Sequence, residues 1–184
     1  MDKVQINVSQ QLKASIGEVR RYEINGTVAI ENSDIDVSGK VRLTRTDNGI
    51  LVEGKLVSAI DLTCGRCLSE FRHDLNLIIE EVFYPTTDIH TGAAIPVPDE
   101  PGCFTINENN ILDLTDAVSQ YALMAIPIKP LCRKDCAGMC PVCGTNLNTG
   151  SCDCPSAAAD PRWDGLRKLV TIDSEEPVKD KKGN

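Results

Sequence analysis

Cysteine spacing is the feature that most limits how this chain can fold. Six cysteines fall within 23 residues, between Cys132 and Cys154, and a further pair lies far upstream in Cys64-Gly65-Arg66-Cys67. In Cys140-Pro141-Val142-Cys143-Gly144, two residues separate the thiols and a glycine follows, which lets both sulfurs face one ion across a tight turn. Such a C-x-x-C turn is called a zinc knuckle. Because Zn²⁺ prefers four ligands, a second pair of thiols has to complete the coordination. We therefore expect one or two zinc ions per chain.

Eight of the nine cysteines would fill two tetrahedral sites. We assign one ion to Cys140, Cys143, Cys152 and Cys154 and the other to Cys64, Cys67, Cys132 and Cys136, which would clamp the C-terminal module onto the preceding sheet. Spacing alone does not fix this pairing, and one filled site with spare thiols is an alternative. An iron–sulfur cluster, which also uses cysteine thiolates, is another. Cys103 is expected to be a bystander thiol in a loop.

Composition and the chain ends limit the class of protein. The 184 residues are 41% hydrophobic and 25% charged with a formal net charge of -8, which excludes wholesale disorder, a membrane protein and a uniformly basic nucleic-acid coat. The N-terminus lacks the pattern of a signal peptide, and nowhere do about 18 apolar residues run together. We expect a cytoplasmic protein, in which paired cysteines indicate metal more often than disulfides.

The charge is unevenly distributed. Residues 1–128 hold 10 basic and 19 acidic side chains, whereas residues 129–170 hold six basic and four acidic ones. The cysteine-rich segment is thus the only part with positive formal charge. This segment could contact RNA locally; alternatively, its small excess of basic side chains is an ordinary variation in surface charge.

The first half of the chain reads as β-strands. Ser38–Thr46 alternates between apolar and polar residues, Asp47-Asn48-Gly49 favours a hairpin turn, and Ile50–Thr63 supplies the returning strand, in which Gly54 could mark a bulge. Phe71–Tyr84 alternates in the same way. We expect an α+β fold: an antiparallel β-sheet or partly open β-barrel, followed by an amphipathic helix and a Cys-rich zinc module.

This reading divides the chain into four parts. An antiparallel β domain covers residues 1–84, and a mobile, acidic, proline-rich loop covers residues 85–110. Residues 111–170 hold a helix opened by Asp113 and ended by Pro127, then the zinc module, then a short helix from Asp160. Residues 171–184 read as a disordered tail.

The sequence offers little for catalysis. Only His73 and His90 could act as general bases near neutral pH, and no Walker loop, nucleophile elbow or dinucleotide fingerprint is present. A closed structural zinc site offers no position for a substrate. We expect no enzyme activity, although Cys64 and Cys67 could form a redox dithiol.

The combination of motifs resembles the YceD family, bacterial and plastid proteins named for large-subunit ribosomal RNA accumulation. The resemblance rests on the segments Cys64-Gly65-Arg66-Cys67-Leu68, Asp113-Leu114 with Pro127, Leu131-Cys132, Cys136 to Gly144, Asn146-Leu147-Asn148, Cys152-Asp153-Cys154 and Asp160-Pro161-Arg162. Met139 stands where the family often has leucine.

The resemblance implies a ribosome-biogenesis factor that supports synthesis, processing or accumulation of large-subunit (23S) ribosomal RNA and binds metal and nucleic acid. Its partner would be that RNA or its precursor, or a basic ribosomal protein, with no membrane and no small-molecule substrate. A zinc-stabilised adaptor in transcription and a C-x-x-C redox protein are the alternatives. Candidate RNA contacts are the basic residues around the proposed metal sites: Arg66, Arg133, Lys134, Arg162, Arg167 and Lys168.

Overall fold

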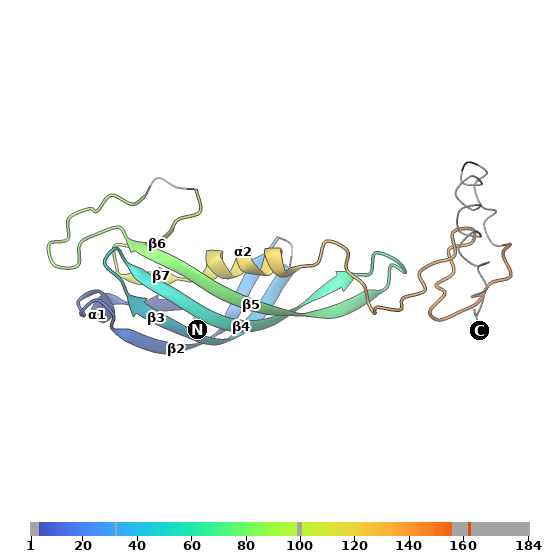
Figure 1. Ribbon diagram of the computed structural model, residues 1–184, viewed down its shortest axis with the longest axis horizontal. Coiled ribbons are helices and arrows are strands. Elements are labelled where there is room, and N and C mark those ends of the chain that lie inside the picture. Colours follow the sequence, from blue (N-terminus) through green and yellow to red (C-terminus); the bar gives the residue numbers. More distant parts are fainter. Residues whose placement is uncertain (1–3, 32, 99–100, 156–161, 163–184) are drawn as a thin grey trace, which may run out of the picture. The chain divides into compact units, whose positions relative to one another are not determined.

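The computed structural model describes residues 4–31, 33–98, 101–155 and 162 (Figure 1). The chain divides into two compact units, residues 1–136 and residues 137–184. The first set of four clustered cysteines therefore belongs to the same unit as the sheet. The tail beyond residue 170 and nearly all of the expected C-terminal helix lie outside the described residues, so both stay predictions.

One mixed sheet dominates the first unit. Among the described residues it has seven strands in the order β1-β7-β6-β5-β4-β3-β2, and all neighbours are antiparallel except β5 and β6. The expectation of a purely antiparallel sheet was wrong at this pair. Parallel neighbours need a crossover of about a dozen residues or more, and the long segment after β5 supplies it. The elements are β1 (Gln5–Asn7), α1 (Ser9–Leu12), β2 (Val19–Ile30), β3 (Ser33–Arg45), β4 (Ile50–Thr63), β5 (Glu70–Pro85), β6 (Phe104–Ile106), β7 (Ile111–Asp113) and α2 (Thr115–Ala125).

The long strands β2 to β5 follow the alternation in the sequence. The hairpin predicted at Asp47-Asn48-Gly49 is confirmed, because it joins β3 to β4 and the Thr46 amide donates to the Gly49 carbonyl at 2.9 Å. The bulge expected at Gly54 was wrong, since the register runs without interruption through its pairing with Val41. A Cβ at Gly54 would lie 2.7 Å from Val41 Cγ1, so glycine here permits a close approach of two strands.

Helix α2 covers one face of the sheet (Figure 1). Leu114, Val118 and Ala122, spaced by four, are fully buried. The helix contacts both β5 and β2, which two strands separate, so the sheet curls around it. Asp113 Oδ1 accepts the Thr115 amide at 2.9 Å, although Asp113 itself ends β7. The helix ends at Ala125, as expected from Pro127.

The proline-rich segment after β5 returns to the sheet. Its last residues form β6, and the Phe104 ring stacks on Phe83 with ring centroids 5.2 Å apart. Asp88 accepts the amides of His90 and Thr91 in a turn within the segment. The segment therefore contributes core side chains that its loop-like composition does not indicate. No helix among the described residues is both long and apolar enough to span a membrane.

Candidate metal centres

The first knuckle forms at the tip of the hairpin between β4 and β5. The Cys64 amide donates to the Ser69 carbonyl at 2.9 Å, and the Leu68 amide donates to the Cys64 carbonyl at 3.0 Å. These bonds fold Cys64-Gly65-Arg66-Cys67 into a turn that holds both thiols on one side. The Gly65 amide also donates to the Pro130 carbonyl at 2.8 Å, which ties the knuckle to the segment after α2.

That segment brings the second pair of thiols. Cys136 Sγ lies 3.8 Å from Cys64 Sγ, and Cys132 Sγ lies 3.7 Å from Cys67 Sγ. All four sulfurs lie within 4.8 Å of one another. Arg66 Nη1 donates to the Cys136 carbonyl at 3.1 Å and fixes the backbone beside this ligand. Cys64, Cys67 and Cys136 are buried, so this group lies in a small core of its own with Phe71 and Leu131.

The second knuckle, in the other unit, repeats the backbone pattern of the first. The Cys140 amide donates to the Thr145 carbonyl, and the Gly144 amide donates to the Cys140 carbonyl, both at 2.9 Å. A bridge between Met139 and Asn146 closes the turn. Cys152 and Cys154 complete the group, again with all sulfurs within 4.8 Å. Cys143 is exposed, which makes this group the more accessible one.

The two knuckles differ at the residue after the second cysteine. Gly144 has φ +74°, and Leu68 occupies the matching position with φ +56°. Sequence reasoning assigned the tight turn to glycine and missed that a leucine adopts it in the first knuckle. Aligning the two C-x-x-C motifs would have revealed the correspondence.

The four-thiol donor set of both groups fits zinc, and so do the two sulfur–sulfur distances given for the first group. Zn–S bonds of about 2.3 Å in a tetrahedron place the sulfurs about 3.8 Å apart, close to the two distances given above. A disulfide would instead require about 2.05 Å between sulfurs. The structure thus brings together the same two sets of four cysteines that we assigned from the sequence, and each could hold a metal ion. Cys103 belongs to neither set.

Local hydrogen bonds and burial set the proton affinities of these thiols. Hydrogen bonds from the backbone of Cys132 and then of Cys67 lower the pKa of Cys64 to about 6. A hydrogen bond with Thr145 lowers the pKa of Cys143 to about 6. Burial raises the pKa of Cys132 to about 12. Without an ion, each group therefore holds both readily ionised and protonated thiols, and a bound cation would have to displace the remaining protons.

The other candidate residues take varied positions. Arg66, Arg133 and Lys134 are exposed beside the first group, and Arg133 Nε lies 3.6 Å from Asp135 Oδ1. Arg162 is exposed, whereas Arg167 and Lys168 lie outside the described residues.

The two histidines lie apart from the clustered thiols. Neither His73 nor His90 belongs to a potential metal-ligand group in the part of the chain that is described. His73 packs edge-on against Phe71, with ring centroids 6.2 Å apart.

Comparisons with known proteins place these centres in a family. An uncharacterized protein of Mycobacterium tuberculosis (strain ATCC 25618 / H37Rv) is 30% identical over 138 residues, which cover 73% of this chain and 62% of that protein. An uncharacterized Mycobacterium bovis protein matches to the same extent. One from Mycobacterium leprae is 25% identical over 134 residues, covering 72% of this chain and 58% of the relative. The chain thus spans about three fifths of the length of the curated relatives it matches.

No solved structure matches the chain. The profile of the family described as "Large ribosomal RNA subunit accumulation protein YceD" matches residues 52–170. This range includes both knuckles and all eight clustered cysteines. The chain belongs to the YceD family.

Proposed function

We propose that this chain is a non-enzymatic factor that supports the accumulation of large-subunit (23S) ribosomal RNA and carries two structural zinc ions. The observation that carries the proposal is the family match over residues 52–170, because it spans both Cys₄ groups and the helix between the knuckles. Such a factor would work in the cytoplasm, where large-subunit RNA is made and assembled.

The arrangement of ligands supports a structural role for the metal. Four thiolates complete the coordination of zinc, so neither group leaves a position for a substrate or an activated water. In the first group the ion would join the β4–β5 hairpin to the segment after α2, because Cys64 and Cys67 come from one and Cys132 and Cys136 from the other. Metal binding there would stabilise the fold of the first unit, and an ion held by the second group would stabilise the other unit.

The same arrangement favours a four-ligand metal site over a two-thiol redox pair. A thioredoxin-like pair requires the two thiols of one C-x-x-C motif to form a disulfide with each other. Here all four sulfurs lie within 4.8 Å of one another, and each thiol of the motif also has a close neighbour from the other segment: Cys136 Sγ lies 3.8 Å from Cys64 Sγ and Cys132 Sγ lies 3.7 Å from Cys67 Sγ. Zinc coordination uses all four together.

Charge supports either of two macromolecular partners. Residues 1–136 hold 13 basic and 20 acidic side chains, which would attract a basic ribosomal protein over a distance. Arg66 and Lys134 offer exposed positive charge beside the first Cys₄ group, where RNA phosphates could bind. We propose large-subunit RNA or its precursor as the first partner.

Cells that lack this chain test the proposal. We expect the ratio of 23S to 16S RNA to fall, and expect the full chain to restore it. Tagged protein purified from growing cells should enrich large-subunit precursor RNA over total ribosomal RNA. An unchanged ratio of 23S to 16S RNA, together with no enrichment of large-subunit precursor RNA, would contradict the proposed function. Enrichment that disappears after protein digestion would instead identify a ribosomal protein as the direct partner.

A further inference from the structure

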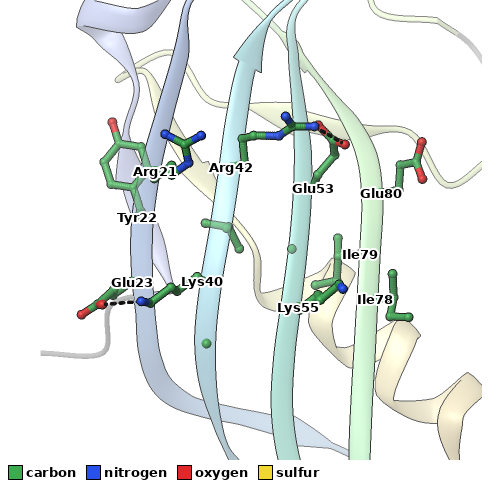
Figure 2. A pocket seen from close by; sticks show the side chains of 13 residues that line it. Arg21, Tyr22, Glu23, Lys40, Arg42, Glu53, Lys55, Ile78, Ile79 and Glu80 are labelled. Carbon is green, nitrogen blue, oxygen red and sulfur yellow. Dashed lines mark hydrogen bonds and ion pairs between the residues drawn. The ribbon is translucent and has the colours of Figure 1, made fainter.

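A band of charged side chains crosses the face of the sheet opposite α2. Two rows of cross-strand neighbours form it on β2, β3, β4 and β5 (Figure 2). The first row is Arg21, Arg42, Glu53 and Glu80, and the second row is Glu23, Lys40, Lys55 and Ile78. A groove of about 870 Å³ runs over both rows, and no cysteine lines it.

Each row places two cations directly opposite each other. Arg21 pairs with Arg42, and Lys40 pairs with Lys55 in the strand register. Like charges on directly opposed residues destabilise a sheet. Two such pairs side by side would destabilise the sheet unless neighbouring carboxylates or a bound anion offset the repulsion.

One member of each cation pair is already neutralised. Arg42 forms a two-pronged ion pair with Glu53 at 2.6 and 2.7 Å, and Lys40 Nζ lies 3.6 Å from Glu23 (Figure 2). The side chains of Arg21 and Lys55 have no ion-pair partner among the described residues. Each row thus contains one cation without an ion pair; with Glu80 counted, the first row is neutral overall and the second has one excess positive charge.

The spacing and the floor of the groove suit a nucleic-acid strand. The rows are two residues apart along each strand, about 6.7 Å, which is close to the step between successive phosphates of an extended single strand. Ile78, 66% exposed beside Lys55 in the second row, supplies an apolar surface for a sugar or base. Glu80 limits the cationic part of the groove at β5.

We propose that this groove binds a single-stranded segment of RNA, with successive phosphates at Arg21/Arg42 and at Lys40/Lys55. The proposal rests on the proposed function, because it names the surface through which the factor would hold large-subunit RNA. It assigns RNA contact to the sheet face in addition to the basic residues beside the cysteines.

The test compares two double variants of the full, zinc-loaded chain. R21Q/K55Q removes the two unpaired cations of the groove. K13Q/R72Q removes the same charge from exposed residues outside it. Affinity for a fluorescein-labelled oligouridylate is measured by anisotropy across a range of salt concentrations, with oligoglutamate as the competing acidic peptide.

The expected change follows from counterion release. Each lost phosphate contact lowers the salt slope by about 0.7, so R21Q/K55Q should lose about 1.4 in slope and about 25-fold in affinity at about 0.1 M salt. K13Q/R72Q should bind nearly as wild type. Equal affinity of the two variants, no RNA binding by the wild type, or displacement of RNA by equimolar oligoglutamate would each overturn the groove proposal.

A cellular arm separates this proposal from the proposed function. If R21Q/K55Q keeps wild-type RNA affinity while the wild-type chain restores 23S RNA, the groove proposal fails and the proposed function stands. If R21Q/K55Q loses RNA affinity in vitro but the wild-type chain does not restore 23S RNA, the groove binds RNA and the proposed function fails.

Discussion

Replacing Gly54 with alanine tests the strand register that builds the groove. The added Cβ would lie 2.7 Å from Cγ1 of Val41, about 1 Å closer than an ordinary carbon–carbon contact. Val41 is 2% exposed and β-branched, so it has little room to move. Overpacking of this kind costs about 1–3 kcal/mol, and the lower unfolded-state entropy of alanine offsets about 0.4–1 kcal/mol of it. We expect Gly54→Ala to destabilise the protein by about 1–2 kcal/mol.

The partner substitution makes the prediction specific to this contact. Val41→Ala alone removes two buried methyl groups, at about 0.8 kcal/mol each plus the cost of the cavity. In the double variant the new Cβ at Gly54 enters that cavity, so the double variant should be no less stable than Val41→Ala. Urea unfolding of the zinc-loaded chain, followed by circular dichroism, gives the three free energies. If the free-energy losses of the two single variants add up to that of the double variant within about 0.5 kcal/mol, the proposed register and the Gly54–Val41 contact are refuted.

Three further predictions follow from other parts of the molecule. A chelator should remove zinc from the wild-type chain in two phases, a fast one from the group of exposed Cys143 and a slow one from the group of buried Cys67. Cys67→Ser should abolish the slow phase and Cys143→Ser the fast phase. Gln11→Ala should lower the free energy of unfolding in urea by about 2–3 kcal/mol, because the buried Gln11 Nε2 donates to a backbone carbonyl of β3 at 2.7 Å. The exposed control Lys13→Ala should change it by close to zero. Burial alone would raise the pKa of Asp113, but hydrogen bonds from Thr115 and Gln5 outweigh it and lower the pKa. The ionised carboxylate therefore stabilises the folded protein above the ordinary carboxyl pKa, and this contribution is lost as the pH falls below about 4. Asp113→Asn should therefore flatten the acid limb of stability against pH, and an unchanged limb would contradict this.

Local patterns predicted the parts of the fold that local chemistry determines. The Asn48-Gly49 turn, the end of α2 before Pro127 and the knuckle at Cys140 each follow from a few adjacent residues. The grouping of cysteines into two sets could be proposed because each C-x-x-C pair needs a second pair. In the first group the two pairs meet beside the hydrogen bond from the Gly65 amide to the Pro130 carbonyl, which joins residues far apart in sequence.

Long-range pairing decided the rest. The parallel β6 could not be predicted, because Phe104 becomes a core residue only after the preceding segment crosses back to β5. The role of Gly54 depends on which residue of β3 stands opposite it, and periodicity alone does not fix register. The groove was missed for the same reason, since Arg21 and Lys55 are more than thirty residues apart and only the register brings them into one band.

Metal stoichiometry of the purified chain tests the central claim most directly. Mass spectrometry of the metal content, on protein purified under reducing conditions without chelator, should give two zinc ions per chain. Cys136→Ser and Cys140→Ser should each reduce the value to one, because each removes a ligand from one of the two Cys₄ groups. Iron in place of zinc, or a wild-type value of one or none, would contradict the account of two structural zinc centres.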